Sequence, residues 1–122
     1  MILLIEDDFI LRKSLAEFLN EEGFDVECAA DGREGLRRLA STNRRRPSLI
    51  LLDMIMPRMS GPEFCMQQKA TPDQMKIPLI AISAVAFREQ DLGFLGLKRA
   101  FQKPLDPPEM LTALWELASP SH

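Results

Sequence analysis

The chain has 122 residues, 46% of them hydrophobic, which fits a single domain with one core. Its formal net charge of −3 excludes the basic surface that nucleic-acid-binding domains use. Its longest apolar stretch, residues 79 to 87 with Ser83 inside it, is far shorter than the roughly 20 residues that cross a membrane. The first segment turns acidic at Glu6, unlike a signal peptide. We therefore expect a cytoplasmic protein without direct membrane or nucleic-acid contacts.

Two cysteines and one basic run are assigned no function. Cys28 and Cys65 are too few for a disulfide framework and have no metal-ligand neighbours at standard spacing, so we expect reduced thiols. Arg44 to Arg46, just before Pro47, form the one dense basic run, which we interpret as a solvated loop rather than a phosphate-binding patch.

Strand-like and helix-like segments alternate along the chain. Short apolar runs predict strands at 2–5, 25–29, 49–52, 79–82 and around 100–102. Helical spacing of apolar residues and capping signals predict helices between and after them. These helices are expected from Leu11 to Leu19 with a stop at Gly23, over 31–41, from a cap at Ser60, weakly over 87–95, and from a cap at Asp106 to about Leu117.

This alternation predicts an α/β fold in which helices cover both faces of a parallel sheet. Right-handed crossovers leave few topologies, and we expect a flavodoxin-like (βα)5 three-layer sandwich with a five-stranded parallel sheet of order 2-1-3-4-5. Residues 1–122 form one domain in this interpretation, and no output domain is visible in the sequence.

Four of the predicted strands end at polar side chains. The first is followed by Glu6, Asp7 and Asp8, the third by Asp53, the fourth by Ser83 and the fifth by Lys103. The carboxyl ends of parallel strands share one edge of a sheet, where sites form in open α/β folds. The predicted strand order places the first and third strands side by side, so the acids approach one another.

Crowded carboxylates repel unless a cation compensates them, and oxygen ligands without a nearby His or Cys favour a hard cation. Mg²⁺ fits best, because it takes one or two carboxylates, keeps waters and binds phosphate. Asp53 is then a candidate nucleophile toward phosphorus, with Lys103 and Ser83 as a fixed charge and a hydroxyl donor for the transferred oxygens.

Glu6-Asp7, the run from Asp53 to Pro57, Gly61, Ser83 and Lys103-Pro104, in this order, resemble the receiver domain of bacterial two-component response regulators. The resemblance implies that Asp53 accepts a phosphoryl group from a phosphohistidine of a histidine kinase or histidine phosphotransfer protein. It implies Mg²⁺ bound by Asp7, Asp53 and the Ile55 backbone carbonyl, with Glu6 reached through water. It also implies a cis Lys103–Pro104 peptide, a signalling domain rather than an enzyme, and an unidentified downstream protein partner. Asp8 has no family role, and we expect it to cap the first helix.

The sequence departs from the family pattern at the output side. Receiver domains usually carry an aromatic residue three positions before the lysine, where this chain has Ala100, and Phe101 is predicted to face the opposite side of the sheet. Ile55 and Val85 occupy positions that in the family tune attack by water. Both are apolar, so we expect a long-lived phosphoryl group.

Other interpretations stay open at this stage. Taken singly, the acids fit as helix caps or turn residues, and Ser83 and Lys103 as ordinary surface residues. The missing aromatic also fits an interaction module that signals without phosphorylation. A phosphatase with an aspartate nucleophile is less consistent, because such enzymes carry a second acid where Ile55 stands. A homodimer is possible.

Overall fold

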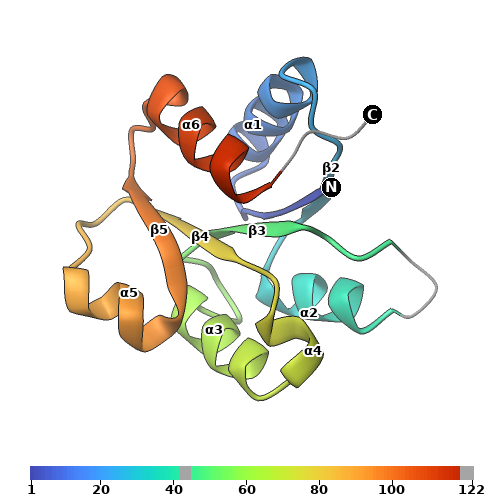
Figure 1. Cartoon of the computed structure of the whole chain (residues 1–122), viewed down its shortest axis with the longest axis vertical. Coiled ribbons are helices and arrows are strands. Elements are labelled where there is room, and N and C mark those ends of the chain that lie inside the picture. Colours follow the sequence, from blue (N-terminus) through green and yellow to red (C-terminus); the bar gives the residue numbers. More distant parts are fainter. Residues whose placement is uncertain (42–44, 119–122) are drawn as a thin grey trace.

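The computed structural model describes residues 1–41 and 45–118, so Arg44 of the predicted basic loop lies outside the described residues. Five parallel strands form one sheet in the order β2-β1-β3-β4-β5 (Figure 1), which confirms the predicted fold and strand order. The strands are β1 (Ile2–Ile5), β2 (Val26–Ala29), β3 (Leu49–Asp53), β4 (Leu79–Ser83) and β5 (Leu97–Gln102).

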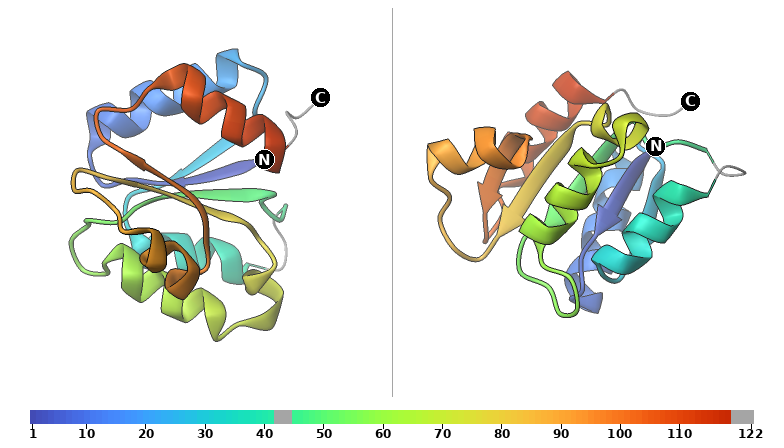
Figure 2. Two further views of the ribbon diagram at one scale, coloured as in Figure 1. Left: turned by 60° about the vertical axis from the view of Figure 1, so that its left-hand side comes forward. Right: turned by 90° about the horizontal axis from the view of Figure 1, so that it is seen from below.

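Helices cover both faces of the sheet, giving three layers (Figures 1 and 2). One face carries α1 (Phe9–Glu21) and α6 (Pro107–Leu117), and the other carries α2 (Gly32–Ala40), α3 (Gly61–Lys69) and α5 (Glu89–Leu95). A short helix, α4 (Pro72–Met75), lies between α3 and β4 along the chain. None of the helices within 1–41 and 45–118 combines the length and apolarity that a bilayer crossing requires.

The alternation of side chains along the strands builds one core on each face of the sheet. Along β3, Leu49 and Leu51 pack on the α1 and α6 side, whereas Ile50 and Leu52 pack on the opposite side. The same alternation separates Phe101, which packs toward α1 and α6, from Ala100, which packs on the α5 side. The predicted orientation of these two residues is therefore confirmed.

Three predicted caps are present at helix starts. Asp8 accepts hydrogen bonds from the backbone N–H groups of Ile10 and Leu11, which confirms it as the cap of α1. Ser60 and Glu63 form a reciprocal capping box at α3. Asp106 caps α6. Asp8 and Asp106 cap helices shortly after β1 and β5, whereas Ser60 caps α3 at the end of the longer loop that follows β3.

The prediction was wrong at the boundaries of the later elements. Strand β5 begins at Leu97, three residues before the predicted start, because it is an edge strand in which Lys98 is exposed and masks the apolar pattern. Helix α4 was not predicted, although Pro72 is a standard signal for a first helical turn. The weak helix expected over 87–95 forms as α5, shorter by two residues at its start.

Candidate functional site

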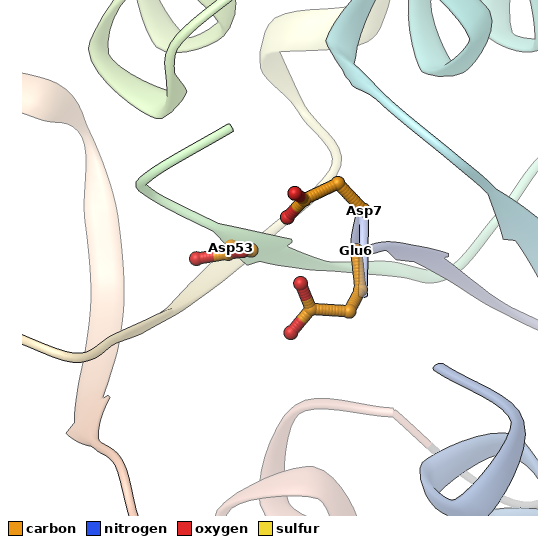
Figure 3. A group of neighbouring side chains, drawn as sticks. All are labelled: Glu6, Asp7 and Asp53. Atoms are coloured by element: carbon orange, nitrogen blue, oxygen red, sulfur yellow. The ribbon is translucent and has the colours of Figure 1, made fainter. Parts of the chain in front are cut away.

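Three carboxylates meet at the carboxyl edge of the sheet, the edge at which the parallel strands end. Strands β1 and β3 are paired with Ile5 opposite Leu52, so the residues that end or follow them are neighbours. The ligand oxygens of Glu6, Asp7 and Asp53 all lie within 4.8 Å of one another (Figure 3). The predicted approach of these acids is thus observed.

The environments of the three acids differ. Glu6 is fully buried and Asp53 is 2% exposed, whereas Asp7 is exposed. Burial of charged carboxylates is unfavourable unless cations or donors compensate them. Asp7 is therefore accessible from solvent, whereas Glu6 and Asp53 are buried.

Lys103 supplies the compensating charge from the end of β5. Its ammonium nitrogen lies 2.9 Å from Oε1 of Glu6 and 3.6 Å from Oδ2 of Asp53. The Lys103–Pro104 peptide is cis, as expected. Lys103 also joins the adjacent strand through its backbone N–H, which donates to the carbonyl of Ser83 at 2.7 Å. The lysine therefore bridges two acids from the first and third strands.

Ser83 is the last residue of β4, which lies between β3 and β5, and it is 1% exposed. Its hydroxyl oxygen accepts a hydrogen bond from the backbone N–H of Val85 at 3.3 Å. This bond leaves the hydroxyl proton available as a donor. Ser83 therefore belongs to the same strand edge as the acids and the lysine.

Burial and mutual repulsion perturb the acid pocket. Desolvation, reinforced by the neighbouring Glu6 carboxylate, raises the pKa of Asp53 to about 8 from an ordinary value of 3.8. Burial alone would lower the pKa of Lys103, but the hydrogen bond and charge of Glu6, together with Asp53, outweigh it and raise that pKa. Without a further cation, Asp53 therefore holds a proton at neutral pH while Lys103 stays charged.

The donor set of the pocket suits a hard divalent cation. Three carboxylates with facing oxygens are opposed by a single ammonium group, so a second positive charge would relieve their repulsion. Mg²⁺ binds carboxylate oxygens together with waters, and because Asp7 is exposed, an ion can reach the pocket from solvent. The residues present therefore fit the cation that the sequence predicted.

One contact at the acids was not predicted from the sequence. The guanidinium of Arg12 on α1 donates from Nη1 to the backbone carbonyls of Glu6 at 2.8 Å and Asp7 at 3.4 Å. A basic residue so near a helix start opposes the helix dipole, which is the available sequence signal that it has another role. Arg12 fixes the backbone of the turn that presents both acids.

The rim of the pocket is apolar. Ile55 and Val85, two positions after Asp53 and Ser83, are 55% and 58% exposed and line a hollow together with Ser83. Charged or amide side chains that would orient a water are thus absent from positions 55 and 85, both of which lie within the described residues.

Comparisons with known proteins agree with this geometry. Residues 2–115 match the family model of the response regulator receiver domain. The response regulator MprA of Mycolicibacterium vanbaalenii is 41% identical over 83 residues, which is 68% of this chain and 34% of that protein. The chain thus spans about a third of the length of the curated relatives it matches.

Solved structures extend the similarity over nearly the whole chain. The chemotaxis protein CheY4 of Vibrio cholerae is 27% identical, with a TM-score of 0.84 over 96% of this chain and 97% of that one. The response regulator TrrA of Thermotoga maritima, solved in complex with Mg²⁺ and BeF, is 26% identical with a TM-score of 0.79 over 96% and 97%. From its sheet, its acid pocket and these matches, the chain belongs to the response regulator receiver domain family.

Proposed function

We propose that Asp53 accepts a phosphoryl group from a phosphohistidine of a histidine kinase or histidine phosphotransfer protein, and that the reaction depends on Mg²⁺. The observation that carries this proposal is the meeting of Glu6, Asp7 and Asp53 with Lys103 at one edge of the sheet. The membership of the receiver family and the Mg²⁺ complex of the related TrrA support it.

The metal site of this proposal uses Asp7, Asp53 and the backbone carbonyl of Ile55, with Glu6 reached through water. A bound Mg²⁺ would neutralise the acids, favour the ionised form of Asp53 and shield an incoming phosphoryl group from negative charge. Asp7 is exposed and so admits the ion, whereas Glu6 is buried and already engaged by Lys103. On this ground the proposal gives Asp7 a direct contact with the ion and Glu6 a contact through water.

In the transfer step a carboxylate oxygen of Asp53 attacks phosphorus, forming an O–P bond while the N–P bond to the donor imidazole breaks. The electron pair of that bond leaves with the imidazole nitrogen. Lys103 lies 3.6 Å from Asp53 and stabilises the negative charge on the transferred oxygens. Ser83, at the end of the adjacent strand, donates a hydrogen bond from its hydroxyl group to one of these oxygens.

In this proposal the protein acts as a switch and does not turn over a substrate. The phosphoryl group adds about −1.5 to −2 charges at the pocket, and the Ser83 segment reorganises around the new oxygens. That change alters the affinity for a downstream protein partner. The partner is another protein or a second copy of this chain in a homodimer. Residues 1–122 act as a single phosphoacceptor domain in the cytoplasm, alone or as part of a longer protein.

Intact-mass spectrometry after incubation with acetyl phosphate and Mg²⁺ tests the proposal. We expect one phosphoryl adduct on the parent chain, none on Asp53→Asn, and the parent result on Asp8→Asn, a matched control because Asp8 is a neighbouring acid that caps α1. Omission of Mg²⁺ should abolish the adduct. Release of many phosphates per chain would instead indicate a phosphatase.

A second candidate function is an interaction module that signals without phosphorylation. The observation in its favour is Ala100, which packs on the α5 side where the family usually has an aromatic residue. The intact pocket of acids and lysine argues against it. Absence of any adduct from an intact, folded parent chain would favour this module.

The apolar rim predicts a long lifetime for the adduct. Because Ile55 and Val85 offer no hydrogen-bonding group to orient a water, hydrolysis of the acyl phosphate should be slow. We expect Ile55→Asn to shorten the half-life by about tenfold, less than the roughly hundredfold of a weak general base, because an amide orients a water without accepting its proton. Loss of label from purified phospho-protein measures it, with Ile55→Val as the control, and a parent half-life of seconds would contradict the prediction.

A further inference from the structure

The segment that directly follows Asp53, residues 54–60, is closed on itself; we name it the phosphoacceptor loop. At its start, the N–H of Ile55 donates to Oδ1 of Asp53 at 3.1 Å. At its end, the N–H of Gly61 donates to the carbonyl of Met54 at 3.0 Å. A Cβ built on Gly61 would lie 2.5 Å from Cα of Met54, a separation that only glycine allows.

The middle of this loop holds an unfavourable backbone conformation. Arg58 has φ of 67°, and it is the one non-glycine residue with positive φ among residues 1–41 and 45–118. A side chain in this region is strained, so the conformation persists only where the surroundings hold it. The contacts of Arg58 therefore show what fixes the loop.

Asp31, in the turn between β2 and α2, is the residue that holds Arg58. Nε of Arg58 donates to Oδ2 of Asp31 at 2.9 Å, and Nη2 of the same guanidinium lies 2.8 Å from that oxygen in an ion pair. Oδ1 of Asp31 accepts the N–H of Glu34 at 2.9 Å and so caps α2. The Asp31 side chain is 9% exposed, so the carboxylate end of the ion pair is fixed in a mostly buried position, whereas the Arg58 side chain is exposed.

A second contact joins the same two segments. The side chain of Met59 lies 3.1 Å from the position that a Cβ on Gly32 would occupy. Residues 58 and 59 of the loop thus dock on residues 31 and 32 at the start of α2. This docking ties the loop after the third strand to the helix after the second.

We propose that Asp31 and Arg58 are positioning residues that raise the affinity of the acid pocket for a divalent cation by holding the phosphoacceptor loop. The inference rests on the proposed function, because the loop contains Ile55, whose backbone carbonyl is the proposed ligand. A ligand on a tethered loop loses less conformational freedom when the cation binds, so the complex forms more readily. Residues that orient metal ligands change affinity without contacting the ion.

Binding of Mn²⁺ to the full chain, followed by electron paramagnetic resonance, tests this without any phosphoryl donor. Arg58→Gly removes the ion pair yet keeps positive φ free of strain, and Asp31→Asn removes the charge yet keeps the cap of α2. We expect each variant to raise the Kd for Mn²⁺ about tenfold, near the lower limit for residues that orient ligands. The double variant should bind no more weakly than either single variant.

Arg33→Ala is the matched control, since it removes an exposed arginine from the first turn of α2 beside Asp31. Its Kd for Mn²⁺ should stay within about twofold of the parent value, because an exposed charge is screened. Thermal unfolding of every variant is recorded in parallel. A lowered Tm with an unchanged Kd in Arg58→Gly and Asp31→Asn would show a merely structural pair and overturn the inference.

The parent chain and Asp7→Asn separate this inference from the proposed function. Binding by the parent that is lost in Asp7→Asn supports the metal site. If the parent binds no Mn²⁺, the proposed function and the inference both fail. If the parent binds and the Arg58→Gly and Asp31→Asn variants bind equally well, the inference alone fails.

Discussion

The carboxyl edge of the sheet and the region of α5 are held together in different ways. At the edge, Glu6, Asp53 and Ser83 are buried, and Lys103 contacts Glu6, which lies 97 positions away in the sequence. In α5, none of the seven described residues 89–95 is buried, and Phe94 is 69% exposed. The site is built from buried polar groups joined across the sheet, whereas α5 packs on the core only through partly buried residues such as Leu92 and Leu95.

This difference indicates where the molecule opens most easily. Segments with few buried apolar contacts open locally at a small fraction of the global free energy of unfolding. Helix α5 also contains Gly93, and it lacks a side-chain cap hydrogen bond at its described N-cap residue Arg88. The pocket should therefore stay formed while α5 exchanges between states, which suits a fixed chemical centre beside an adaptable surface.

Among the predicted effects of substitution, we expect the largest loss of stability when Lys103 is removed from the carboxyl edge of the sheet. Lys103→Met leaves Glu6 buried without its ammonium partner, and loss of one partner of a buried pair typically costs about 3 kcal/mol. We expect a drop of that size in the free energy of unfolding near neutral pH, measured by urea denaturation without divalent cations. Lys98→Met, an exposed lysine on the same strand, is the control and should change stability by less than about 0.5 kcal/mol.

The perturbed carboxyl of Asp53 predicts a pH dependence of stability. Its folded pKa of about 8 lies above its ordinary value of 3.8, so between these pH values the folded state keeps a proton that the unfolded chain has released. The contribution of Asp53 to the free energy of unfolding is fully present below pH 3.8 and is lost as the pH rises toward about 8. We expect a loss of about 3 kcal/mol between roughly pH 5 and pH 7.5 in metal-free buffer, and little change in Asp53→Asn.

Urea denaturation at the two pH values measures this effect. Asp31 has the opposite sign, because the N–H of Glu34 and then Arg58 hold its pKa below 3.8, but its contribution is lost only under more acidic conditions. It therefore does not obscure the window. Equal pH slopes for the parent and Asp53→Asn would contradict the assignment of a protonated Asp53.

The smallest predicted effects concern two glycines, Gly93 in α5 and Gly61 at the start of α3, and they compare the two regions directly. A Cβ on Gly93 meets no described heavy atom within 4 Å, so Gly93→Ala should stabilise α5 by up to about 1 kcal/mol. Hydrogen exchange of the α5 amides should slow accordingly while exchange of the β3 amides stays unchanged. Gly61→Ala should do the reverse and destabilise the chain, because its Cβ would collide with Met54. Faster exchange in α5 of Gly93→Ala would show that the helix needs its flexibility to form.

Much of the site was predictable because polar residues stop apolar runs. The ends of β1, β3 and β4 are marked this way by Glu6, Asp53 and Ser83, and strand order alone then brings them together. The parallel, doubly covered sheet was predictable for the same reason, since its central strands are apolar on both faces.

The features that escaped prediction depend on side-chain partners distant in sequence or on weak local patterns. Nothing near Lys103 in the chain indicates that Glu6 is nearer to it than Asp53, and nothing near Asp31 indicates Arg58. The early start of β5 was hidden by the exposed Lys98. Such contacts are set by packing rather than by propensity or periodicity.

The identity of the phosphorylated residue tests the central claim most directly. The full chain is incubated with acetyl phosphate and Mg²⁺, reduced with borohydride, which converts an acyl phosphate of aspartate to homoserine, and then mapped by peptide mass spectrometry. We predict homoserine at position 53 and unmodified aspartate at position 7. Homoserine at position 7, or aspartate retained at both positions in a chain that carries the phosphoryl adduct, would contradict the account.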